Sequence, residues 1–291
     1  MRIDDERESS NVEDRRGSGG GRGLGGGMGR GIGIGTVVIA LVAVLFGADP
    51  STILALLSGG QGGPAPQTSG QQQAAPVDDE ASRFVRRVLA KTEDTWGVIF
   101  KASGAQYRQP KLVLFSGATR TACGVGETAM GPFYCPADEK VYIDLAFNEE
   151  LATRFGAPGQ FAQAYVIAHE VGHHVQNLLG IAAKVEEVRR RSNEQDANAL
   201  SVRMELQADC FAGVWARTAD EMKRFLERGD VEEALRAAAA IGDDRLQRQT
   251  RGQVVPDSFT HGTSEQRVRW FKAGFETGSV RACDTFSARS L

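Results

Sequence analysis

The sequence predicts an α+β domain, mostly helical with a small sheet, preceded by a single transmembrane helix. Three observations support this prediction. Most of the chain after residue 80 has apolar residues at helical spacing, segments 111–115 and 141–145 have the composition of short strands, and residues 31–48 form an uncharged run. The predicted divisions are a disordered cytoplasmic tail at 1–30, the transmembrane helix at 31–48, a flexible linker at 49–79 and a folded domain at 80–291.

The composition is ordinary for a globular protein. Of 291 residues, 24% are charged and 41% are hydrophobic, and the net charge is −3. No basic cluster persists beyond the N-terminal segment, which argues against a nucleic-acid-binding protein. The folded part, about 210 residues, is long enough to bury a single core.

The N-terminal segment predicts a membrane anchor. Residues 1–30 mix charges with glycine and contain few large apolar side chains, so we expect them to be disordered. Residues 31–48 would form a helix about 27 Å long, enough to cross a bilayer core. A cleaved signal peptide would have a shorter charged region and a shorter apolar region, and a buried core helix does not fit between a tail and a linker. The arginines that precede this run are Arg15, Arg16, Arg22 and Arg30.

The charge distribution predicts the orientation of the chain. No lysine or arginine follows the apolar run until Arg83. By the positive-inside rule, the N-terminus should lie in the cytoplasm and the folded domain in the periplasm or outside the cell. The linker at 49–79 is rich in glycine, proline and glutamine, and about 20 such residues span about 25 Å, so the domain should stay close to the membrane.

The folded domain should begin with an amphipathic helix at 80–102, followed by the strands at 111–115 and 141–145. Between these strands lies a loop at 121–136 that is interrupted by glycine and proline. Its two cysteines are placed to form a disulfide, which leaves the other two to pair with each other. The alternative is four buried free thiols. The expected bonds are Cys123–Cys135 and Cys210–Cys283.

The central motif is His169-Glu170-Val171-Gly172-His173, inside an apolar helix expected from about Pro158 to Gly180. Histidines four residues apart lie on one face of a helix, where both rings can reach one tetrahedral zinc ion. Glu170 is then placed to take a proton from a water molecule. The alternative is a pair of surface histidines. His174 lies about 100° further round the helix, so we expect it to pack or to support the site indirectly.

A catalytic zinc site usually has three protein ligands. Glu205 and Asp209 are four residues apart in an apolar helical segment, where a buried carboxylate is costly unless it is paired or binds a metal. We expect Glu205 to be the third ligand and Asp209 to accept a hydrogen bond from the ring N–H of a ligating histidine. In the alternatives, both acids are solvated, or Glu194 or Asp196 is the ligand.

The region after the site should form helices at 220–227, at 229–251 and after Thr263, which with Gln266 forms a capping box. His261 precedes the last helix. We expect His261 to stabilise the oxyanion of a tetrahedral intermediate, and the alternative is a loop histidine bonded to the backbone. Tyr142 and Tyr165 are weaker candidates for this role.

The motifs occur in a characteristic order: 121–124, 131–136, 141–145, 169–176, 205–210, 261–267 and 282–286. In this ordered set the chain resembles the bacterial neutral zinc metallopeptidase family of YpfJ-type proteins over nearly its whole length. The resemblance implies a zincin-like metalloprotease fold with Glu205 as third ligand, as in gluzincins with an E-x-x-x-D helix.

Together, these observations predict a membrane-anchored zinc endopeptidase with one Zn²⁺ per chain, a peptide or protein substrate and Glu170 as general base. The strand at 141–145 is a candidate edge that would bind an extended peptide. The alternative is a zinc-stabilised envelope scaffold that binds a partner without turnover. No segment identifies a partner protein.

Overall fold

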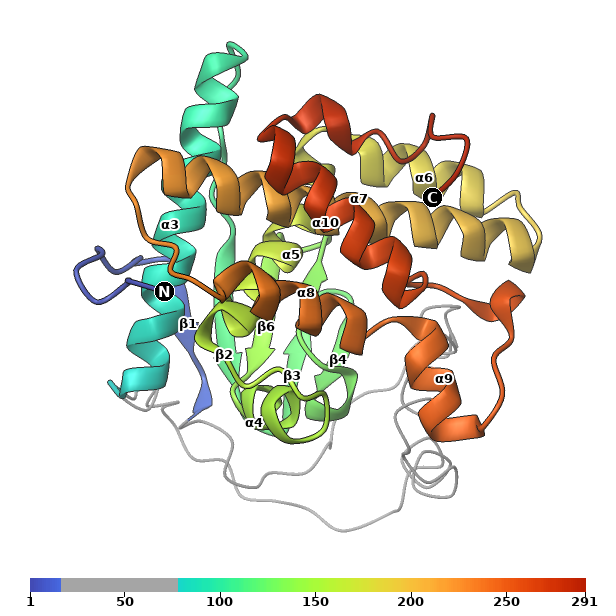
Figure 1. Ribbon diagram of the computed structural model, residues 1–291, viewed down its shortest axis with the longest axis horizontal. Helices are drawn as coiled ribbons and strands as arrows, with labels where there is room; N and C mark the ends of the chain where they lie inside the picture. The colour runs from blue at the N-terminus through green and yellow to red at the C-terminus, as the bar shows by residue number, and fades with distance from the viewer. Residues whose placement is uncertain (17–77) are drawn as a thin grey trace, which may run out of the picture.

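A computed structural model describes residues 1–16 and 78–291 of the chain (Figure 1). The predicted transmembrane helix at 31–48 and nearly all of the linker at 49–79 lie outside these residues. Within the described residues, no helix is both long enough and apolar enough to cross a membrane. This part of the chain is mostly helical and contains short strands, which agrees with the predicted α+β class.

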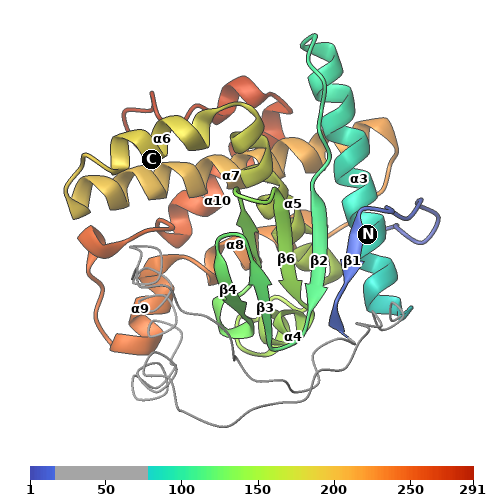
Figure 2. The same ribbon diagram turned by 180° about the vertical axis from the view of Figure 1, so that it is seen from behind.

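The main sheet has four strands in the order β1-β2-β6-β5 (Figure 2). Strands β1, β2 and β6 are parallel, and β5 is antiparallel to β6. A separate hairpin pairs β3 with β4. The strands are β1 (Val12–Asp14), β2 (Lys111–Phe115), β3 (Ala118–Thr121), β4 (Gly124–Glu127), β5 (Phe133–Cys135) and β6 (Lys140–Asp144).

The two faces of this sheet enter different cores because successive side chains of a strand point to opposite faces. The face toward the helices contributes Leu112, Leu114, Val141 and Ile143 to the main core. The opposite face forms a small cluster of Val113, Phe115, Cys135 and Tyr142, with Phe133 packed against it.

Strand β1 belongs to the segment that we expected to be disordered. It pairs in parallel with β2, and Ile3 is only 3% exposed. The prediction of a disordered tail is therefore wrong for residues 1–16, while residues 17–30 lie outside the described residues. The charges that suggested a solvated segment are instead paired with the domain, as Arg7 is with Glu93 and Asp94.

The predicted peptide-binding edge at 141–145 is also wrong. This segment is β6, which is bonded to β2 on one side and to β5 on the other, so it has no free edge. The strand at that end of the sheet is β5.

Helices α3, α5, α7, α8 and α10 pack together on one side of the sheet (Figures 1 and 2). The helices are α3 (Glu80–Ala102), α4 (Ala146–Thr153), α5 (Gln160–Leu178), α6 (Ile181–Arg189), α7 (Glu194–Met222), α8 (Asp230–Ala240), α9 (Asp243–Arg251) and α10 (Ser264–Thr277). Short 3₁₀ turns are η2 (Thr128–Met130), η3 (Pro256–Ser258) and η4 (Val280–Cys283). The predicted capping box of Thr263 and Gln266 begins α10.

Two of the predicted C-terminal helices differ from the structure. Helix α7 continues to Met222, so no separate helix forms at 220–227. The segment 229–251 forms two helices that break at Gly242, because the backbone of Ser264 approaches closely there. A Cβ atom on Gly242 would lie 2.4 Å from the Ser264 nitrogen. Helix α8 packs its alanines into the core, where Ala234, Ala237, Ala238 and Ala240 are fully buried.

Candidate metal centre

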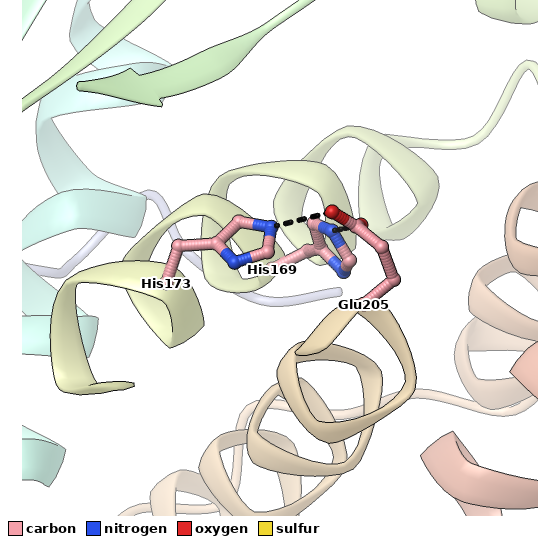
Figure 3. A group of neighbouring side chains, drawn as sticks. All are labelled: His169, His173 and Glu205. Atoms are coloured by element: carbon pink, nitrogen blue, oxygen red, sulfur yellow. Dashed lines mark hydrogen bonds and ion pairs between the residues drawn. The ribbon is translucent and has the colours of Figure 1, made fainter. Parts of the chain in front are cut away.

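The close crossing of α5 and α7 brings the predicted ligands together. Gly172 permits this approach, because a Cβ atom there would lie 3.0 Å from the Ala208 oxygen. Glu205 then faces both rings of the H-E-x-x-H motif, with Oε2 3.1 Å from His169 Nε2 and Oε1 3.5 Å from His173 Nε2 (Figure 3). Ligand atoms of these three residues all lie within 4.8 Å of one another.

Each histidine presents the same ring nitrogen to this centre because its other nitrogen is already bonded. His169 donates from Nδ1 to Asp209 Oδ1 at 2.9 Å, and His173 donates from Nδ1 to Gln176 Oε1 at 2.9 Å. Both Nε2 atoms therefore face the centre, where they would bind a metal as neutral imidazoles. Two imidazoles and a carboxylate are a donor set that zinc prefers, so these residues fit a zinc ion.

The charge of Asp209 is balanced by a buried arginine. Arg267 donates from Nε to Asp209 Oδ2 at 2.8 Å and from Nη2 to Asp209 Oδ1 at 3.0 Å. The hydroxyl of Tyr165 also donates to Asp209. Burial would raise the pKa of Asp209, but the charges of Arg267 and His169 hold that pKa below its usual value. The Asp209 carboxylate is thus held in place and accepts a hydrogen bond from His169, a contact that was expected from the sequence.

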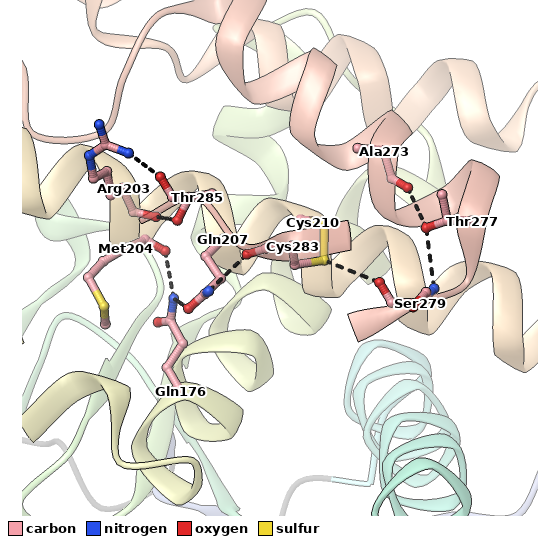
Figure 4. The surroundings of a disulfide bond; sticks show 10 residues. All are labelled: Gln176, Arg203, Met204, Gln207, Cys210, Ala273, Thr277, Ser279, Cys283 and Thr285. Carbon is pink, nitrogen blue, oxygen red and sulfur yellow. Dashed lines mark hydrogen bonds between the residues drawn. A yellow bond between two sulfur atoms is a disulfide. The ribbon is translucent and has the colours of Figure 1, made fainter. Parts of the chain in front are cut away.

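A chain of amides supports His173 in a similar way. Gln176 donates from Nε2 to Met204 O at 2.7 Å and to Gln207 Oε1 at 3.1 Å. Gln207 in turn donates to Cys283 O at 2.9 Å, beside the disulfide that joins Cys283 to Cys210 (Figure 4). The orientation of His173 is therefore connected to the C-terminal segment.

The two predicted disulfides are confirmed. Cys123 is bonded to Cys135 and Cys210 to Cys283, with Cα–Cα distances of 5.8 and 5.5 Å. The second bond joins α7 to η4 one residue after Asp209, so it holds the C-terminal segment against the helix that carries the two carboxylates.

Glu170 lies next to the metal-binding group and is 7% exposed. Burial raises the pKa of its carboxyl above the usual value, although the charges of His173 and His169 act in the opposite direction. A carboxylate with a raised pKa is a better proton acceptor at neutral pH, which is what a general base requires.

His261 lines the same cavity and is held by Asp243. Its Nδ1 lies 3.2 Å from Asp243 Oδ1, and its backbone N–H donates to Oδ2 of the same carboxylate at 2.6 Å. Burial would lower the pKa of His261, but the hydrogen bond to Asp243 and the charge of Glu205 raise it above the usual value. The arrangement favours an imidazolium beside Glu205.

The remaining candidates lie outside the metal-binding group. His174 is fully buried, bonding from Nε2 to Arg108 O at 2.6 Å and from Nδ1 to the Tyr134 hydroxyl at 3.0 Å. The hydroxyl of Tyr142 donates to Asp138, and that of Tyr165 donates to Asp209. Both tyrosines therefore lack a free donor for an oxyanion.

The two alternative acidic ligands, Glu194 and Asp196, are exposed in the first turn of α7.

The group opens into a cavity of about 550 Å³. One wall is polar and contains Glu170, His261 and Arg267. The apolar side chains around it come from η2, β5, helices α4 to α6 and the segment after α4, and include Met130, Phe133, Phe147, Phe155, Val166 and Val185.

Three residues of this site had no role assigned from the sequence. Gln176 lies three positions after His173, on the same helix face, so helical spacing alone could have indicated it. Asp243 and Arg267 reach the site only through the packing of α9 and α10 against α7 and α8. No local pattern in the sequence connects Asp243 to His261 or Arg267 to Asp209.

Comparisons with known proteins agree with this geometry. The sequence model of the family described as "Putative neutral zinc metallopeptidase" matches residues 1–286. The chain is 53% identical to the uncharacterized protein YpfJ of Escherichia coli K12 over 286 residues, which cover 98% of this chain and 99% of that protein. An uncharacterized protein of Mycobacterium tuberculosis is 44% identical over 222 residues, covering 73% of this chain and 74% of that protein. No solved structure matches the chain.

Proposed function

This chain belongs to the putative neutral zinc metallopeptidase family, and on that premise we propose that it is a zinc-dependent endopeptidase with one Zn²⁺ per chain. The observation that carries the proposal is the convergence of His169, His173 and Glu205 beside the buried carboxyl of Glu170. A scaffold would need only the first three residues. The zincin-like architecture that the family resemblance implies remains a prediction.

The three converging side chains would hold the metal, with Asp209 and Gln176 fixing the two rings. When bound, zinc supplies a Lewis acid that polarises a carbonyl and makes a water molecule more acidic. The ring orientations do not need to change on binding, because both Nδ1 atoms already donate to protein acceptors. Preorganisation of this kind favours tight binding.

Glu170 would act as the general base. Its carboxylate accepts a proton from the attacking water and then donates that proton to the amine that leaves as the peptide bond breaks. Its raised pKa makes both transfers feasible near neutral pH. Burial also excludes bulk water that would compete for the proton.

His261 would stabilise the negative charge that develops on the carbonyl oxygen of the substrate. Asp243 occupies Nδ1, which leaves Nε2 to donate a hydrogen bond into the cavity. A preorganised donor of this kind typically contributes 10²–10³-fold to turnover.

The substrate would be an extended peptide. Strand β5 ends the sheet beside the cavity, and Phe133 and Tyr134 of this strand contribute to the cavity wall. An edge strand can bind an extended chain through its backbone groups. The apolar side chains of the cavity, Phe147 and Phe155 among them, favour a substrate with a large apolar residue next to the cleaved bond.

The two disulfides support a location outside the cytosol, and we propose that the domain acts in the periplasm or at the cell exterior. To test the metal assignment, zinc content and cleavage of an unfolded protein are measured on the purified full chain before and after chelation. The proposal expects about one zinc per chain, loss of both zinc and cleavage on chelation, and recovery of both on adding zinc. Zinc without cleavage in any state would favour the scaffold.

A further inference from the structure

We propose that residues 1–16, the N-terminal arm, are a structural part of the folded domain, and that the arm and the domain lie on the same side of any membrane to which the chain is attached. This inference is independent of the peptidase activity. It replaces the predicted arrangement in which the N-terminus is cytoplasmic and the domain is outside.

The arm is held by its backbone at several points. Strand β1 pairs in register with β2, where Leu112 N donates to Asn11 O at 2.8 Å and Arg15 N donates to Leu114 O at 2.8 Å. Further along the arm, Ser9 N donates to Arg86 O at 3.0 Å. The arm therefore completes the edge of the sheet and also contacts α3.

Helix α3 has two buried charges whose partners come from the arm. The carboxylate of Glu93, 1% exposed, accepts hydrogen bonds from Ser9 Oγ at 2.6 Å, Asn11 Nδ2 at 2.7 Å and Arg7 Nη2 at 2.8 Å. Two residues earlier on the same helix, the ammonium of Lys91, 6% exposed, lies 2.9 Å from the carboxylate of Glu6.

Buried charges of this kind are costly without partners. Among the described residues, every hydrogen-bond donor to the Glu93 carboxylate belongs to the arm. The sequence of α3 is therefore suited to a domain that always carries the arm, and a tail separated from the domain by a membrane would leave these two charges unmatched.

The end of the arm and the start of α3 lie next to each other. Arg16, the last described residue of the arm, binds Asp79 through an ion pair of 2.8 Å, and Asp79 is the N-cap of α3. Next to it, Arg86 binds Glu8 of the arm at 2.9 Å and Asp78 at 2.7 Å. Figure 2 shows β1 beside β2 at the edge of the sheet, close to the start of α3.

These contacts between the arm and the start of α3 determine on which side of a membrane the arm lies relative to the domain. A single crossing between residues 16 and 78 would put the arm and α3 on opposite sides of the bilayer, where their strand pairing and ion pairs could not form. The described contacts therefore require the arm and the domain to lie on one side of any bilayer to which the chain is attached.

Thiol labelling of the full chain in intact cells tests the proposal. All four cysteines form disulfides, so the wild type offers no free thiol as background. One thiol is introduced in the arm as Asp5→Cys and another on α10 as Lys272→Cys, both at exposed positions. Each variant is treated with a membrane-impermeant maleimide before and after permeabilisation, and denatured lysate gives the maximum signal.

The proposal expects the two thiols to behave alike, whether both are labelled in intact cells or both only after permeabilisation. Labelling of one thiol in intact cells and of the other only after permeabilisation would overturn it. Hydrogen exchange on the purified full chain gives a second measurement. The Arg15 and Leu112 amides should exchange about 100-fold or more slowly than unstructured amides, and exchange at the unstructured rate would also overturn the proposal.

Discussion

Arg267 binds Asp209 through two parallel hydrogen bonds, and both side chains are buried. The same carboxylate accepts from His169, so the arginine on α10 is one step removed from the proposed zinc ligand on α5. Arg267 also approaches His169 directly, with Nη2 3.4 Å from Nδ1, so the C-terminal helix participates in the site mainly through Asp209.

Replacing Arg267 by methionine should therefore affect both stability and zinc binding. Loss of one partner of a buried ion pair leaves the other charge unpaired, at a cost of about 3–5 kcal/mol. Zinc affinity should fall about 10–100-fold because Asp209, the acceptor of the His169 Nδ1 hydrogen bond, is no longer held by Arg267. Urea unfolding and zinc competition with a chelator measure the two effects. The matched variant Arg269→Met, at a half-exposed position on the same helix, should change neither, and equal effects of the two variants would refute this role.

The contact between α7 and α10 depends on Gly213 and Gly274, each of which lies against the backbone of the other helix. A Cβ atom on Gly274 would lie 1.9 Å from the Cys210 oxygen, and one on Gly213 would lie 2.1 Å from the Phe271 oxygen. Gly274→Ala should force the helices apart and destabilise the fold by about 1–3 kcal/mol. Gly97→Ala on α3 meets nothing within 4 Å and should stabilise the fold by up to about 1 kcal/mol. Thermal unfolding of both variants checks these opposite signs, and a stable Gly274→Ala variant would contradict the packing argument.

The two disulfides should contribute unequally to stability. They close segments with sequence separations of 73 and 12 residues, and a longer closed segment restricts the unfolded chain more. Removing Cys210–Cys283 by double alanine substitution should cost about 4 kcal/mol, against about 3 kcal/mol for Cys123–Cys135. Denaturant midpoints of the two double variants test this order. A greater loss of stability on removal of Cys123–Cys135 would contradict it.

The pH dependence of turnover should report on His261. Its pKa is raised above the usual value, so the charged form persists at neutral pH and is lost as pH rises through the raised pKa. Asp243→Asn removes the charge that sustains the imidazolium, so the alkaline limb of kcat/KM should move to lower pH. His261→Ala should lower turnover at least about tenfold with zinc retained. An unchanged alkaline limb, or unchanged turnover in His261→Ala, would show that His261 has only a structural role.

The contacts of the site that could be expected from the sequence are those encoded by local spacing. His169 and His173 share a helix face, as do Glu205 and Asp209, so helical periodicity was sufficient to group each pair. Bringing the two pairs together requires the crossing at Gly172, which the sequence indicates only through small residues. The contributions of Arg267 and Asp243 depend on the positions of α9 and α10, and no local pattern determines those positions.

In the fold, too, the elements set by local patterns were predicted, and those set by distant segments were missed. Helix α5 and strand β2 were predicted with correct boundaries or nearly so because their apolar patterns are long and regular. Strand β1 was missed because three residues rich in charge form a strand only when the edge of β2 is present. The break at Gly242 was missed for a related reason, since it lies where the backbone of Ser264, distant in sequence, approaches closely.

The most direct test of the proposed activity is Glu170→Gln in the full chain, which keeps the size of the side chain and removes its basicity. Zinc content and cleavage of an unfolded protein are measured together for this variant and the wild type. We expect equal zinc in both proteins and a cleavage rate about 10²–10⁴-fold lower in the variant. Equal zinc with equal cleavage would contradict the assignment of Glu170 as general base, and absence of zinc from the wild type would contradict the metal centre itself.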